Sequence, residues 1–150
     1  MNARTIELLA ASFARVCANK SDAATIFYAR LFMTAPELRP LFQTDIESQK
    51  RKLMSSLAQI VDFYRVGVDP TSYLAELGRS HQGYGAQRSH FDSVGDALLF
   101  TLAQVLGQEF SPEIRAAWVS AYAEVSAAMI RAGDIEAAPA PHPLAETARL

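Results

Sequence analysis

The sequence predicts a single all-α domain, and three observations support this prediction. The length of 150 residues points to one domain rather than several. Apolar residues recur at helical spacing, as at Ile6, Leu9, Phe13 and Val16 near the start of the chain. Strand signals are missing, because no stretch alternates apolar and polar residues between turns and no Asn-Gly or Asp-Gly hairpin occurs.

Polar caps and early prolines predict where the helices of the first half begin. A second helix begins at Ser21-Asp22, after the one that contains Ile6. Thr34-Ala35-Pro36-Glu37 has capping-box spacing and begins a short third helix that ends near Pro40. Thr44-Asp45-Ile46-Glu47 is another capping box and begins a long helix.

The second half follows the same rules. Asp69-Pro70 is an N-cap followed by proline at the first helical position, and the GYG at 83–85 interrupts the helix that follows. Further helices begin at 89–92 and at Ser111-Pro112, and Gly107 and Gly133 close them. We expect the domain to cover residues 1–133, before a disordered tail over 134–150 that is rich in Pro and Ala.

Composition excludes several classes of function. The formal net charge is −2 and there is no basic run, so we expect neither nucleic acid nor an acidic membrane as partner. The single cysteine, Cys17, excludes an intramolecular disulfide and a CxxC motif. Residues 1–20 do not read as a signal peptide, and no apolar run is long enough to span a membrane. We therefore expect a cytoplasmic protein, monomeric or homodimeric.

Three polar residues lie on apolar helical faces. His81 continues the spacing of Leu74 and Leu77, while Gln49 and Tyr28 each lie within a helical turn of apolar neighbours on both sides. A buried polar group without a partner costs roughly 1–3 kcal/mol, so each needs one. Taken singly, each is explained by a hydrogen bond to a backbone carbonyl in an ordinary core.

Taken together, the three are compatible with a cofactor site. Neutral imidazole is a common axial ligand of haem iron, and haem needs an apolar slot with a few placed polar groups. The hydroxyl of Tyr28 and the amide of Gln49 are hydrogen-bond donors that suit a partly anionic bound gas. Spacing alone does not decide between this site and plain core.

Longer motifs carry a family resemblance. FYARLFMTAPELRPLF (27–42) resembles the second and third helices of bacterial single-domain haemoglobins and of flavohaemoglobin globin domains. SQKRKLM (48–54) resembles their distal helix, and LGRSHQGYG (77–85) resembles their proximal helix. SHFDSVGDALLFTLAQVLG and AAWVSAY resemble the last two helices. The resemblance covers about residues 5–130.

This resemblance implies a globin fold, with helices packed around a pocket for haem b (iron protoporphyrin IX). It makes His81 the proximal iron ligand, Tyr28 the residue that points at bound gas, and Gln49 the gate or second donor. Lys52 is a candidate partner of a haem propionate, or else part of a solvated charged face. The other expected pocket residues are Phe27, Leu31, Phe42, Leu53, Leu57, Leu77, Phe91, Val94 and Leu98.

The chain departs from the flavohaemoglobin pattern near the proximal histidine. Phe91 stands where that family has a tyrosine, and Arg131-Ala132-Gly133 stands where it has a glutamate. Such partners tune a ligated histidine, so their loss argues against strong peroxidase-like or self-contained nitric oxide dioxygenase chemistry. No reductase motifs follow the globin segment.

Three functions follow from the resemblance. The first is reversible binding and transport of oxygen, with NO and CO as further ligands, at a five-coordinate or weakly six-coordinate iron and without enzymatic activity. The alternative is a nitric oxide dioxygenase that works with a separate reductase. The third is a haem-free sensor or interaction module, which would have no use for His81, Tyr28 and Gln49 together.

Overall fold

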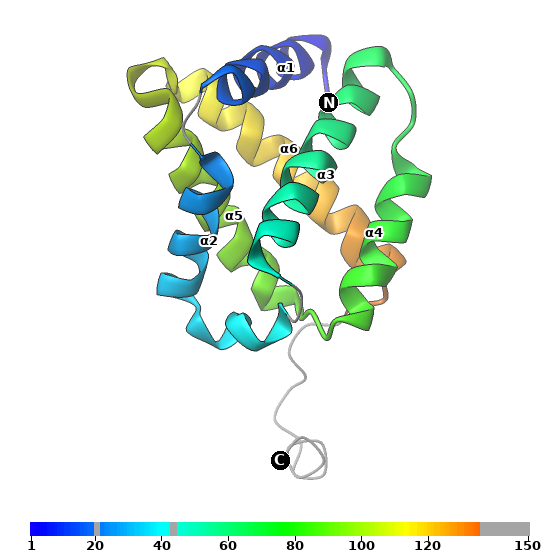
Figure 1. The fold of residues 1–150 in the computed structure, drawn as a ribbon. Coiled ribbons are helices and arrows are strands. Elements are labelled where there is room, and N and C mark those ends of the chain that lie inside the picture. Colours follow the sequence, from blue (N-terminus) through cyan, green and yellow to red (C-terminus); the bar gives the residue numbers. More distant parts are fainter. Residues whose placement is uncertain (20–21, 43–44, 136–150) are drawn as a thin grey trace, which may run out of the picture.

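The computed structural model describes residues 1–19, 22–42 and 45–135, and regular structure within these ranges is entirely helical (Figure 1). The expected all-α fold is confirmed. The elements, in chain order, are α1 (Ala3–Ala18), α2 (Ala23–Thr34), the 3-10 helix η1 (Pro36–Leu41), α3 (Ile46–Val66), α4 (Thr71–Gly83), α5 (Arg88–Leu106), the short η2 (Gly107–Glu109) and α6 (Pro112–Ala132).

Side-chain caps begin most of the helices, as the sequence indicates. Asp22 and Asp45 accept hydrogen bonds from the backbone N–H three residues on, and Ser111 caps α6 in the same way. At the other end, Gly67 closes α3 with φ at +77°, a left-handed conformation that glycine adopts without strain. The expected ends of α5 at Gly107 and of α6 at Gly133 are also confirmed.

Three expected helix starts are wrong in detail. The capping box at 34–37 does not form, because the hydroxyl of Thr34 donates to the carbonyl of Arg30 and η1 has no side-chain cap. Pro70 is the cap rather than the first residue of α4, while Asp69 accepts from the backbone N–H of Thr71. The helix expected to begin at 89–92 begins at Arg88. Ser21 and Thr44 lie outside the described residues.

Helix α6 is the element around which the others are arranged. It crosses behind α3 in Figure 1, with α2 and α5 to one side of α3 and α4 to the other. Close helix pairs include α4 with α6 and α2 with α5, whereas α3 packs closely on α1 and α2. Within the described ranges, α3 and α4 lack extensive backbone packing on each other and meet through side chains such as the rings of Phe63 and Tyr73, 5.5 Å apart.

The buried residues form two separate clusters. The larger joins α1, α2, η1, α5 and α6 and includes Trp118, whose Nε1–H donates to the hydroxyl of Ser12 over 2.8 Å. The smaller joins α4, Phe91 of α5 and the second half of α6, and side chains near the end of α3 pack against it. A small domain usually has one contiguous core with smaller satellite clusters, and here the boundary between the main core and its satellite separates α2 from α4.

The described chain ends on the smaller cluster. Ile135 is buried there, and its backbone N–H donates to the carbonyl of Ile130. The expected tail from residue 136 on lies outside the described residues. No helix within the described ranges is long and apolar enough to cross a membrane.

Candidate functional site

Tyr28 lies on α2 inside a group of aromatic rings. Its side chain is buried, with ring centroids 5.0 Å from Phe27, 5.7 Å from Phe32 and 5.5 Å from Phe42. Phe42 follows η1, so the 3-10 turn brings it back over α2. The chain thus holds the Tyr28 ring in a fixed, apolar surrounding with only its hydroxyl left for polar contacts.

The hydroxyl of Tyr28 reaches α3. It donates to the backbone carbonyl of Gln49 over 3.3 Å, which is long for an O–H···O bond and therefore weak. Burial raises the pKa of Tyr28 to about 12, so the hydroxyl keeps its proton at neutral pH. The structure therefore brings Tyr28 and Gln49 together and leaves Tyr28 a donor whose present bond is easily exchanged.

Helix α3 has an apolar inner face but no fully buried residue. Gln49 is partly buried near its start, and Leu53 and Leu57 follow at helical spacing. Both leucines pack against the larger cluster and remain partly exposed. An amphipathic helix normally buries the middle of its apolar stripe, so this face is incompletely covered by protein.

His81 lies on α4 and its orientation is set by a backbone contact. Its Nδ1 is 2.7 Å from the carbonyl oxygen of Leu77, one helical turn earlier. A carbonyl can only accept, so Nδ1 carries a proton, and in the neutral imidazole the lone pair is therefore on Nε2. Nε2 makes no hydrogen bond with any described residue. The ring centroid lies 6.0 Å from that of Phe91 on α5 and 6.3 Å from that of Tyr84.

The donor chemistry around His81 fits a metal held by a prosthetic group. A neutral imidazole with Nδ1–H bonded to a carbonyl is the usual state of a metal-ligating histidine. Among residues 1–19, 22–42 and 45–135, no three His, Cys, Asp or Glu side chains come together to hold a bare ion. A metal at His81 would thus need its remaining ligands from a cofactor, and haem supplies them.

The expected pocket residues divide between the two core clusters. Eight of them, including Tyr28 and Leu98, belong to or pack on the larger cluster, whereas Leu77 and Phe91 belong to the smaller one with α4. The eight are Phe27, Tyr28, Leu31, Phe42, Leu53, Leu57, Val94 and Leu98. The structure thus places Tyr28 and its apolar neighbours on one side of the boundary between the clusters. It places His81 with Phe91 on the other side.

Lys52 is exposed on α3. It has no ion-pair partner in the described part of the chain, whereas Lys50 on the same turn pairs with Glu47 at 3.0 Å. The expected propionate partner is therefore available, on the helix that also contains Gln49.

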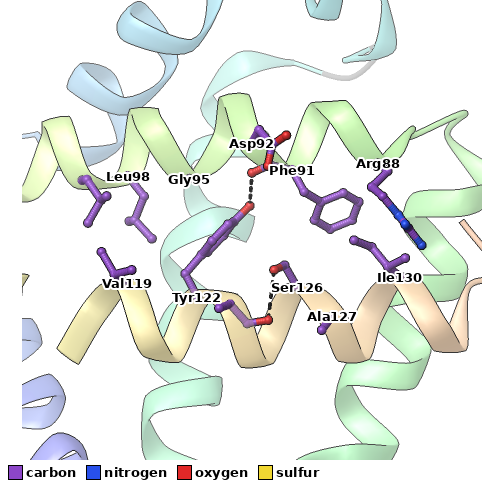
Figure 2. A pocket seen from close by; sticks show the side chains of 12 residues that line it. Arg88, Phe91, Asp92, Gly95, Leu98, Val119, Tyr122, Ser126, Ala127 and Ile130 are labelled. Carbon is purple, nitrogen blue, oxygen red and sulfur yellow. Dashed lines mark hydrogen bonds between the residues drawn. The ribbon is translucent and has the colours of Figure 1, made fainter. Parts of the chain in front are cut away.

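A hollow lined by side chains of α5 and α6 lies between these two helices (Figure 2). It has a volume of about 430 Å³ and shares Phe91 and Leu98 with the expected pocket. At its edge the hydroxyl of Tyr122 donates to the carbonyl of Phe91 over 2.5 Å. On α6, Tyr122 lies within a helical turn of the buried Trp118 and Val125, so its hydroxyl also needs a partner. The rule that singled out Tyr28 would also have singled out Tyr122.

Comparison with known proteins identifies relatives over most of the chain. The sequence model of the Globin family matches residues 25–129. The chain is 30% identical over 145 residues to a neuroglobin from Tetraodon nigroviridis, covering 87% of this chain and 91% of that protein. It is 27% identical over 131 residues to a flavohemoprotein from Bacillus subtilis (strain 168), covering 85% of this chain and 33% of that protein.

A solved structure is also similar to this chain over most of its length. A Pseudomonas aeruginosa PAO1 protein, described as structurally highly homologous to a human hemoglobin, superimposes with a TM-score of 0.77. It is 26% identical, and the match covers 85% of this chain and 97% of that chain.

Proposed function

Because the chain belongs to the globin family, a family of haem proteins, we propose that it binds haem b through His81 and reversibly binds oxygen on the opposite face. Small gas ligands follow from the family, and the choice of oxygen binding and transport is our proposal. Haem iron, when bound, supplies a coordination position for a diatomic ligand such as O₂, NO or CO.

The division of the core is the observation that best supports this proposal. Leu53, Leu57 and Phe42 contact the larger cluster, Leu77 contacts the smaller one, and the His81 ring lies against its Phe91, yet all but Phe91 are only partly buried. A flat apolar group between the clusters would complete their burial and join the two parts of the core. Each fully buried Leu or Phe contributes roughly 1.5–3 kcal/mol, which gives haem a substantial apolar binding energy.

His81 would hold the cofactor from the α4 side. The bond between Nδ1–H and the Leu77 carbonyl fixes the orientation of the ring, leaves Nε2 as the nitrogen that can ligate, and makes the imidazole a better electron donor. Phe91 packs against the ring but has no polar atom, so it restricts rotation without adding basicity. The proximal side is thus suited to holding a ligand reversibly rather than to driving bond cleavage.

Tyr28 and Gln49 would act on the opposite face. The buried hydroxyl of Tyr28 is a protonated donor in an apolar surrounding, where a hydrogen bond to a partly charged ligand is strengthened. The amide of Gln49 is a second donor from α3. Apolar neighbours such as Leu53 would exclude water from this site and so limit side reactions there. Lys52 would pair with a propionate at the surface.

The test is the absorption spectrum of wild type and of His81→Ala, each titrated with hemin, then reduced with dithionite and exposed to carbon monoxide. We expect a sharp Soret band that shifts at each step in wild type and is lost or altered in the variant. A wild-type protein without a Soret band after hemin addition would refute haem binding. Equal spectra in both proteins would remove His81 as ligand.

A nitric oxide dioxygenase that uses a separate reductase is the second candidate. The similarity to a flavohemoprotein favours it, although this chain spans only a third of that protein. Steady-state consumption of nitric oxide with added reductase and nicotinamide cofactor would separate the two functions. Sustained turnover would establish the dioxygenase, and consumption limited to one equivalent per haem would exclude it.

A further inference from the structure

Helix α4, which contains His81, meets α6 backbone to backbone at a pair of glycines. A Cβ added at Gly78 would lie 2.3 Å from the carbonyl oxygen of Met129, and one added at Gly133 would lie 2.4 Å from the carbonyl oxygen of Gly78. Real Cβ atoms essentially never lie within 3.0 Å of such an atom. Both glycines are buried. The contact therefore depends on the absence of side chains on both helices.

The position of Gly78 on α4 relates this contact to His81. Gly78 lies three residues before His81, so the two residues are neighbours on the surface of the helix. An interior helical glycine is less stable than alanine in the same place, so Gly78 costs helix stability that the close contact explains. At Gly83, the last residue of the same helix, an added Cβ would meet nothing within 4 Å.

Helix α6 also fixes the partner that packs on the histidine ring. The hydroxyl of Tyr122 donates to the carbonyl of Phe91 over 2.5 Å, and Figure 2 shows this bond crossing from α6 to α5. The Tyr122 ring lies against Gly95, where an added Cβ would be 2.8 Å from Cε2. Phe91 and His81 are thus both positioned from α6, one through Tyr122 and the other through the glycine pair.

We propose that Gly78 and Gly133 are positioning residues that set the place of the His81 imidazole relative to Phe91, and through it the strength of iron ligation. The proposal rests on the proposed function, since it takes His81 as the iron ligand. A methyl group at Gly78 must move α4 away from α6 by roughly 1 Å at that point to restore van der Waals distances. Displacements of that size are large for a ligand whose bond has a fixed length and direction.

The experiment compares Gly78→Ala and Gly133→Ala with Gly83→Ala as the matched control. Hemin affinity and the iron–histidine stretching band of the reduced protein, measured by resonance Raman, are the readouts. We expect Gly78→Ala and Gly133→Ala to lower hemin affinity about tenfold and to shift or broaden the band, and Gly83→Ala to change neither. An unshifted band and unchanged affinity in folded Gly78→Ala would overturn the proposal.

Two further measurements keep the test decisive. If circular dichroism shows that Gly78→Ala does not fold, Gly133→Ala becomes the test of the proposal. Gly133 follows the last residue of α6, so the end of that helix can shift to accommodate the added methyl group. If wild type shows no Soret band after hemin addition, the proposed function fails, and the nuclear Overhauser contact between the His81 and Phe91 rings is compared in the haem-free proteins. Loss of that contact in Gly78→Ala but not Gly83→Ala supports positioning, and retention in both overturns it.

Discussion

Replacing Tyr28 by phenylalanine separates a structural role from a role in ligand binding. The substitution removes one hydroxyl and leaves the ring among Phe27, Phe32 and Phe42. The lost bond to the Gln49 carbonyl is long, at 3.3 Å, so it contributes about 0.5 kcal/mol, the lower end for a neutral hydrogen bond. We expect the free energy of unfolding of the haem-free protein to change by about that amount.

The effect on oxygen should be larger. A hydrogen bond to a charged group contributes about 1.5–3 kcal/mol, and Tyr28 gives up about 0.5 kcal/mol at Gln49 to make it. The difference, about 1–2.5 kcal/mol, corresponds to roughly a 5- to 60-fold change in affinity. Because affinity within one site changes mainly through dissociation, we expect the oxygen dissociation rate to rise by that factor in stopped-flow measurements.

Tyr64→Phe is the matched control. Its hydroxyl donates to Glu124 over 2.9 Å near the other end of α3, far along the helix from Gln49. We expect an oxygen dissociation rate within about twofold of wild type, since a deletion remote from the ligand changes stability rather than dissociation. An unchanged rate in Tyr28→Phe would refute the donor role of Tyr28. An equal rise in both variants would show that the effect is a general loosening of α3.

Three other predictions concern stability and cofactor binding. Burial raises the pKa of Tyr28 from 10 to about 12, so the protonated hydroxyl stabilises the folded state fully below pH 10. This stabilisation, roughly 2–3 kcal/mol, is lost as the pH rises to 12. Urea unfolding from pH 9 to 12 should therefore show a smaller loss of stability in Tyr28→Phe than in wild type. Ser12→Ala leaves the buried Nε1–H of Trp118 without its acceptor and should cost about 1–3 kcal/mol in urea unfolding, where an unchanged midpoint would contradict the reasoning. Lys52→Gln should weaken hemin binding less than about fivefold in titration, because an exposed ion pair contributes about 1 kcal/mol or less.

Much of the fold follows from local sequence signals. The apolar spacing of Leu9, Phe13 and Val16 predicts a buried face that the structure confirms, and Gly107 and Gly133 end helices where expected. One expected cap fails because its side chain bonds to the backbone of the preceding helix instead of capping the next one. Thr34 bonds back to Arg30, so its hydroxyl is not available to begin η1.

The candidate site is less accessible to sequence reasoning because it depends on contacts between distant segments. Helical spacing places Tyr28 and Gln49 on inner faces, but it does not reveal that the hydroxyl of one bonds the main chain of the other. The same holds for Tyr122 and Phe91, which are 31 residues apart. Gly78 is visible as a glycine inside a helix, yet only the structure shows the carbonyl that lies against it.

The division of the core has a consequence for how the molecule opens. Among the described elements, helix α4 has its extensive backbone contact with α6, through the small cluster around Leu74 and Met129, and meets α3 and α5 mainly through single rings. Regions with few buried apolar contacts unfold locally at low free energy. We therefore expect the amides of α4 to exchange with solvent faster than those of α2 and α5 in the haem-free protein. Hemin would then slow exchange in α4 first, so that loading the cofactor completes the folding of the helix that ligates it.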